Sequence, residues 1–108
     1  MLQCTQQGDA LTVHLCGEID HCAAEGLRNE IEMQIVRQNA KRLILDFSQV
    51  TFMDSSGIAV VLRVKKRMEE TDGDVFLLDP APQCARVLRT SGIERFVAIK
   101  FTEGKAAR

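Results

Sequence analysis

Two kinds of apolar pattern alternate along this chain, and this alternation constrains the fold most. From residue 20 onward, stretches with apolar residues at helical spacing alternate with short apolar runs of strand length. A strand, a helix and a second strand in this order require a crossover connection, which places the two strands parallel in one sheet. Before this region, Leu11, Val13 and Leu15 alternate with polar residues after a Gly8-Asp9 turn, so we expect an opening hairpin.

These patterns predict one α/β domain over residues 1–108, with a mixed, mostly parallel sheet of four to five strands flanked by three to four helices. The run Leu43-Ile44-Leu45 is typical of a strand covered on both faces, and residues 50–53 read as an anchored loop. The other strands are expected near residues 2–6, 11–16, 75–78 and 96–101, and the helices at about 21–36, 58–70 and 82–91.

Composition excludes several function classes. The net charge is −1 and the chain has no Tyr or Trp, so nucleic-acid binding is not expected, and the basic run Arg63–Arg67 reads as a solvated helix face. The chain shows neither a membrane span nor a secretory signal, and no glycine-rich loop indicates a nucleotide cofactor. We therefore expect a cytoplasmic protein with reduced cysteines, of which Cys16, Cys22 and Cys84 should be buried.

The motif Asp54-Ser55-Ser56-Gly57 carries the strongest functional signal. It follows a buried strand and precedes a helix, a position at which open sheets usually carry functional sites. Backbone N–H groups and the helix dipole at such a position favour a phosphoryl group. A plain helix cap would account for Asp54, but not for two adjacent hydroxyls. The motif therefore indicates phosphorylation of either Ser55 or Ser56.

Two other chemical uses of these residues fit the sequence poorly. A serine hydrolase would need a Gly-x-Ser-x-Gly elbow, which is missing, and a base, for which the chain offers only His14 and His21. A metal site built from His14, Cys16, His21 and Cys22 would have a spacing that matches no zinc pattern. We expect neither.

The chain resembles the STAS domain family, and within it the anti-sigma factor antagonists, most closely the sporulation type that acts on an anti-sigma-F factor. The phosphorylation-loop segment is the most specific part of the resemblance, which covers nearly the whole chain. The segments that carry it are Gly17-Glu18-Ile19-Asp20-His21, Phe52-Met53-Asp54-Ser55-Ser56-Gly57, Val60-Val61-Leu62, Asp79-Pro80-Ala81-Pro82 and Ser91-Gly92-Ile93.

This resemblance implies a binding module that is not itself an enzyme. Its unmodified form would bind an anti-sigma factor that is also a serine kinase, and would thereby release the sigma factor. The kinase would phosphorylate Ser55, a PP2C-type phosphatase would reverse the reaction, and Asp20 together with residues 54–58 would form the contact surface (Asp54, Ser55, Ser56, Gly57 and Ile58). The alternative is a STAS module of another partner-switching, stress-sensing or lipid-transport complex. Members of the family often end in a further helix, for which residues 102–108 are too short.

Overall fold

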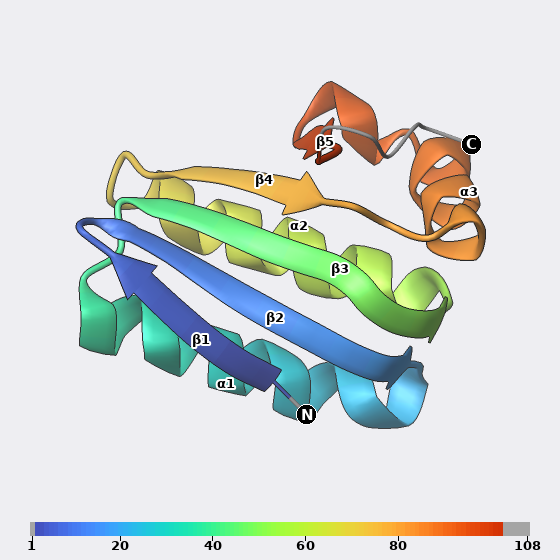
Figure 1. Ribbon diagram of the computed structural model, residues 1–108, viewed down its shortest axis with the longest axis horizontal. Helices are drawn as coiled ribbons and strands as arrows, with labels where there is room; N and C mark the ends of the chain where they lie inside the picture. Colours follow the sequence, from blue (N-terminus) through green and yellow to red (C-terminus); the bar gives the residue numbers. More distant parts are fainter. Residues whose placement is uncertain (1, 103–108) are drawn as a thin grey trace.

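The strands form one mixed sheet in the order β1-β2-β3-β4-β5, as seen in a computed structural model that describes residues 2–102 (Figure 1). The first two strands pair antiparallel and every later pair is parallel, which confirms the hairpin and the crossovers expected from the sequence. The strands are β1 (Leu2–Gln7), β2 (Ala10–Ile19), β3 (Arg42–Met53), β4 (Asp74–Leu78) and β5 (Ala98–Lys100).

Three α-helices and one short 3₁₀ helix connect the strands. In Figure 1, α1 and α2 lie side by side behind the sheet, and α3 lies at the end of the sheet where β3 ends. The helices are α1 (His21–Gln38), α2 (Ser55–Glu69), α3 (Pro82–Ser91) and η1 (Ile93–Arg95). The predicted α/β class and element order are confirmed. The expectation about a further terminal helix concerns residues that, beyond Thr102, lie outside the described part of the chain.

The core lies between the sheet and the helices α1 and α2. Alternate residues of β2 and β3 point into it and are almost completely buried, which is the period-two pattern of a strand with one covered face. The helices contribute residues at spacings of three and four. The main core side chains are those of Leu11, Val13, Leu15, Leu27, Ile31, Ile35, Leu43, Leu45, Phe47, Val61, Val64 and Met68.

Two expectations about β3 were wrong. Residues 50–53 are not a loop but the last residues of β3, because β2 continues alongside them through register shifts on either side of Gly17. Gly17 has a φ of 81°, a conformation that glycine adopts at little cost. The strand is also covered on only one face, since Ile44 points away from the helices and stays half-buried.

The positions of one helix start and of two cysteines also differ from expectation. The helix α2 begins at Ser55 rather than after Gly57, because Asp54 caps it, so both serines belong to its first turn. Cys84 is buried as predicted, whereas Cys16 is exposed because it follows Thr12 and His14 on the uncovered face of β2. Cys22 is also exposed, in the first turn of α1. That face carries no helix within residues 2–102.

Candidate functional site

The ends of β2 and β3 bring the two predicted acidic residues to the same edge of the sheet. Ile19 and Met53 are register partners in the parallel pair, so Asp20 and Asp54 directly follow neighbouring strand ends. The Asp54 N–H donates to the Ile19 carbonyl oxygen at 3.3 Å, which ties the two exits together. Each aspartate then caps a helix: Asp20 accepts from the Ala23 N–H at 3.0 Å. Both side chains are half-buried.

The cap at Asp54 changes how many donors the start of α2 can offer. The Ser56 N–H donates to Asp54 Oδ1 at 2.8 Å, and the Gly57 N–H donates to the Asp54 carbonyl oxygen at 3.0 Å. Ser55, as the first residue of the helix, has no intrahelical acceptor for its own N–H. A carboxylate therefore already occupies part of the positive end of the helix dipole beside the two hydroxyls.

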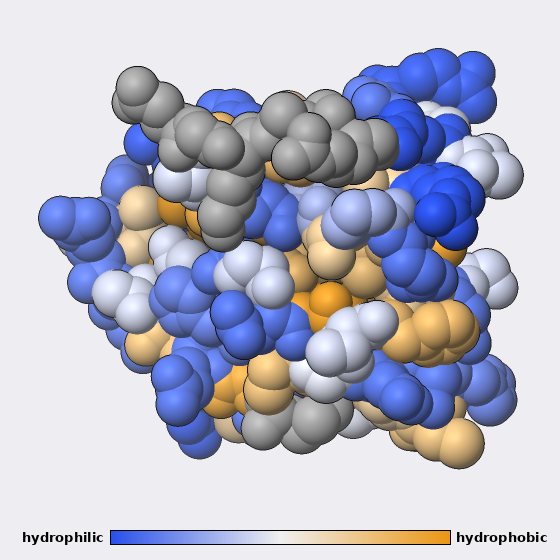
Figure 2. Space-filling view, turned by 45° about the vertical axis from the view of Figure 1, so that its right-hand side comes forward, coloured by the Kyte–Doolittle hydropathy of each residue, from blue (hydrophilic) through white to orange (hydrophobic). Residues whose placement is uncertain are grey.

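The two serines face different surroundings. Ser55 is exposed and lines a groove between α2 and α3, together with Ile58 and Val87. Ser56 is half-buried and lines a second groove, between α1 and α2, together with His21 and Arg28. Figure 2 turns the α3 end of the molecule forward and shows small apolar patches among hydrophilic side chains. The sequence left the two hydroxyls equivalent, and the structure separates them by exposure and by groove.

Gly57 is buried, and its lack of a side chain allows α2 to approach the sheet closely. A Cβ atom at this position would lie 2.3 Å from Met53 Cγ and 2.5 Å from Met53 Sδ. Met53 is fully buried, so its side chain has no solvent to move into. The packing of Gly57 therefore fixes the position of the first turn of α2. The adjacent Ile58 is half-buried and lines the Ser55 groove.

Gln83 is a positioning residue that the sequence analysis missed. Its side-chain amide accepts from the Met53 N–H at 3.0 Å and donates to the Met53 carbonyl oxygen at 2.9 Å. The amide thus continues the hydrogen-bonding pattern of a neighbouring strand at the end of β3, one residue before Asp54. A glutamine after the proline that opens a helix has no distinguishing signal, because its partner lies thirty residues away in the chain.

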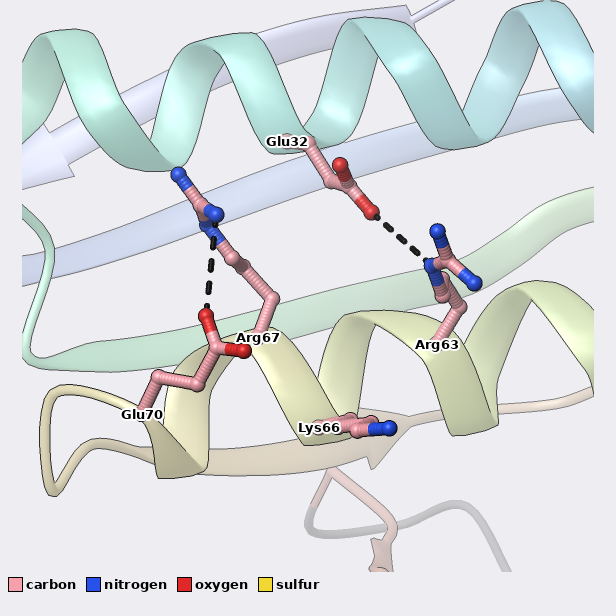
Figure 3. A pocket seen from close by; sticks show the side chains of 5 residues that line it. All are labelled: Glu32, Arg63, Lys66, Arg67 and Glu70. Carbon is pink, nitrogen blue, oxygen red and sulfur yellow. Dashed lines mark ion pairs between the residues drawn. The ribbon is translucent and has the colours of Figure 1, made fainter.

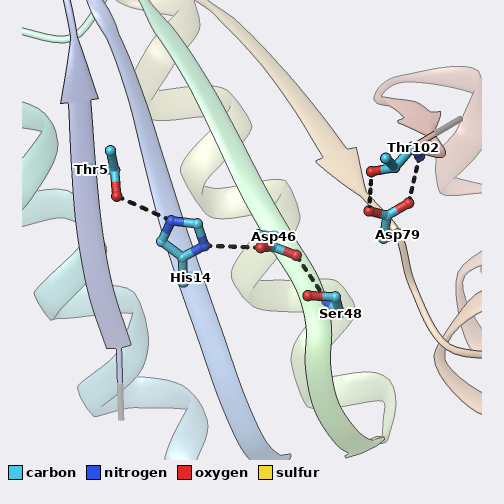
Figure 4. A network of polar contacts seen from close by, with 6 residues as sticks. All are labelled: Thr5, His14, Asp46, Ser48, Asp79 and Thr102. Atoms are coloured by element: carbon cyan, nitrogen blue, oxygen red, sulfur yellow. Dashed lines mark hydrogen bonds and ion pairs between the residues drawn. The ribbon is translucent and has the colours of Figure 1, made fainter.

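The alternative chemical sites are not assembled within residues 2–102. His14 lies in the middle of β2 on the uncovered face, on the side of the sheet opposite α2 (Figure 4). His21 lines the same groove as Ser56, but no hydrogen bond joins the two within residues 2–102. In the described part of the chain, no three His, Cys, Asp or Glu side chains are grouped so that they could hold a metal ion.

A polar network crosses the uncovered face of β1, β2 and β3 (Figure 4). His14 Nδ1 lies 2.8 Å from Asp46 Oδ2, and His14 Nε2 lies 3.2 Å from Thr5 Oγ1. The Ser48 N–H donates to Asp46 Oδ1 at 2.9 Å. Partial burial acts to raise the pKa of Asp46, but the hydrogen bonds from Ser48 and His14 outweigh it and lower this pKa below its usual value. The network therefore stabilises the charged form of Asp46.

The basic run on α2 is a solvated face, as predicted. Arg63, Lys66 and Arg67 are exposed, and the intervening Val64 is buried. Figure 3 shows Arg63 directed toward Glu32 of α1, at 3.8 Å, and Arg67 paired with Glu70 at 3.6 Å. These carboxylates neutralise much of the positive charge, so the run does not form a strong anion-binding patch.

Comparison with known proteins gives one consistent result. The family model for the STAS domain matches residues 1–106. The chain is 33% identical over 85 residues to the anti-sigma F factor antagonist of Lysinibacillus sphaericus, an alignment that covers 79% of this chain and 73% of that protein.

Within residues 2–102, none of the helices combines the length and apolar character needed to cross a membrane.

Solved structures of the anti-sigma factor antagonist SpoIIAA have the same fold. The unphosphorylated form matches with a TM-score of 0.80 at 31% identity, covering 95% of this chain and 90% of that one. The phosphorylated form from Bacillus matches with a TM-score of 0.71 at the same identity, covering 95% and 93%. The chain therefore belongs to the STAS domain family, within which it is similar to anti-sigma factor antagonists.

Proposed function

We infer that this protein is an anti-sigma factor antagonist controlled by phosphorylation of Ser55. In its unmodified form it binds an anti-sigma factor that has serine kinase activity, and the sigma factor is released without touching this chain. Phosphorylation ends the binding, and a PP2C-type phosphatase restores it in the cytoplasm. The names of the relatives support the antagonist role, and SpoIIAA has been solved in phosphorylated and unphosphorylated forms.

The exposure of Ser55 is the observation on which this proposal depends. A kinase must reach the hydroxyl, and Ser55 is an exposed residue at the first position of α2. Asp20 and Asp54 leave the same edge of the sheet, and Ile58 provides apolar surface in the adjoining groove. A partner that docks on this edge would cover the hydroxyl, the two carboxylates and the apolar surface together.

The phosphate would act on this docking surface through charge. It adds about −1.5 to −2 elementary charges and three acceptor oxygens at neutral pH. The helix dipole is already partly compensated by Asp54, whose carboxylate accepts the Ser56 N–H. The start of α2 therefore compensates the new charge only in part, and on the docking surface this charge lies next to the carboxylate of Asp54. Coupling of about 1–3 kcal/mol, or roughly 5- to 150-fold in affinity, is typical of such switches.

The test is phosphorylation by an anti-sigma factor kinase from the same organism with ATP. Mass spectrometry should show one added phosphate on the native chain and on Ser56→Ala, and none on Ser55→Ala. Ser56→Ala is a matched control because it makes the same chemical change, loss of a serine hydroxyl, at the adjacent residue. A phosphate that persists in Ser55→Ala and disappears in Ser56→Ala would contradict the assignment. Full affinity of the Ser55→Asp variant for the kinase would contradict the electrostatic account.

A further inference from the structure

We propose that Arg86 binds the phosphate carried by Ser55, so that the modified side chain lies across the groove between α2 and α3. This inference rests on the proposed function, because it concerns the phosphorylated state. It adds an intramolecular cation that donates hydrogen bonds to the phosphate, and it gives a second reason for the loss of partner binding.

The groove brings Ser55 and Arg86 to one surface. Its lining consists of two residues of α2 and four of α3, which are Ser55, Ile58, Arg86, Val87, Thr90 and Ser91. Arg86 is the one charged side chain among them. A phosphate that enters this groove from Ser55 therefore meets a single cation, next to the hydroxyl-bearing Thr90 and Ser91 and the apolar Ile58 and Val87.

The position of Arg86 relative to Ser55 is set by the hydrogen bonds of Gln83. The two bonds from Gln83 to the Met53 backbone fix the start of α3 against the end of β3, two residues before Ser55. Arg86 lies three residues after Gln83, which places both side chains on one side of the helix. Movement of Arg86 is thus limited to its own side chain.

Arg86 has no competing partner within residues 2–102, where no hydrogen bond or ion pair engages it. Its planar guanidinium matches a phosphate with two parallel N–H donors. The two arginines that share a groove with Ser56 are Arg28 and Arg63, in the separate groove between α1 and α2. Arg63 is moreover directed toward Glu32. Arg86 is therefore the cation that a phosphate on Ser55 can reach within its own groove.

A phosphate held by Arg86 would also cover the apolar floor of the groove. Ile58 and Val87 are half-buried and form that floor. An unphosphorylated chain leaves them available to a partner, whereas the bridge between Ser55 and Arg86 closes over them. Phosphorylation would thus remove apolar contact surface in addition to adding negative charge.

The experiment is a phosphorus NMR titration of protein in which phosphoserine is incorporated at position 55 during translation. The second ionisation of the phosphate, near pH 6 when free, should have its midpoint roughly 0.2 to 0.7 pH unit lower than in the Arg86→Gln variant. Arg42→Gln is the matched control, since Arg42 is exposed at the far end of β3 and its loss changes the net charge equally.

Four comparisons decide the outcome. An unchanged midpoint in Arg86→Gln, or an equal change in Arg42→Gln, overturns the proposal. Arg86→Lys should retain part of the effect, which guards against a variant that folds poorly. Phosphoserine at position 56 should not respond to Arg86→Gln, because Ser56 lines the other groove. No kinase is needed, so a response to Arg86 combined with failed phosphorylation of Ser55 would refute the proposed function and leave this inference standing.

Discussion

Replacing Gly57 by alanine tests the close approach of α2 to the sheet. The added Cβ would overlap Met53 Cγ and Sδ, at 2.3 and 2.5 Å, and Met53 is fully buried. Overpacking of this kind costs about 1–3 kcal/mol, and the better helix propensity of alanine returns roughly 0.5–1 kcal/mol. The net loss of unfolding free energy should therefore be between about 0 and 2.5 kcal/mol.

Gly26→Ala is the matched control for this substitution. Gly26 is exposed in α1, and no atom lies within 4 Å of the Cβ that would be added. The same chemical change should stabilise the protein there by roughly 0.5–1 kcal/mol. The free energies of unfolding of the two variants should thus differ by about 1–3 kcal/mol. In a domain of this size, each kcal/mol changes Tm by roughly 4–8 °C.

Urea unfolding followed by circular dichroism measures both variants against the native chain. In a Met53→Ala background the same Gly57→Ala change should become stabilising, because the truncated side chain leaves room for the Cβ. If Gly57→Ala and Gly26→Ala stabilise the native chain equally, the packing argument is refuted. The start of α2 would then owe its position to the cap at Asp54 alone.

Three further predictions concern single side chains. Gln83→Leu should cost about 1–3 kcal/mol in urea unfolding and speed hydrogen exchange at the Met53 amide, since it leaves two backbone groups without partners; native exchange at Met53 would contradict this. Asp54→Ala should lower the free energy of unfolding by about 0.5–2 kcal/mol, and Tm with it, through loss of a helix cap, whereas Asp54→Asn should retain most of the stability; equal losses would show that charge, not capping, matters. The lowered pKa of Asp46 means that its contribution to stability is present above the unfolded value, about 3.9, and is lost as pH falls through the folded value. Asp46→Asn should therefore flatten the acid side of the plot of urea midpoint against pH, and an unaltered acid slope would argue against the network.

The elements that depend on local pattern were predictable from the sequence. The alternation in β2 and the helical spacing in α1 are produced by burial of one face, so residues such as Leu11 and Ile31 identify the core without knowledge of its partners. The Asp54 motif marked the candidate site at this edge of the sheet, because a cap and two hydroxyls follow a strand directly. These features depend only on residues that are neighbours in the chain.

Apart from the start of α2 at Ser55, which the adjacent Asp54 cap sets, the features that were missed depend on a partner distant in the chain. The extension of β3 to Met53 requires β2 beside it, and the glutamine that holds this end comes from α3. Which face the helices cover decides that Ile44 is only half-buried.

The order of the elements and the position of the serine pair were thus determined by local periodicity and capping. Only the packing of α1 and α3 on either side of α2 decided that Ser55 and Ser56 face separate grooves. Neighbouring positions in the first turn of a helix point in different directions. The side chains that Ser55 and Ser56 face therefore belong to two other helices, α3 and α1, which lie far from each other in the chain.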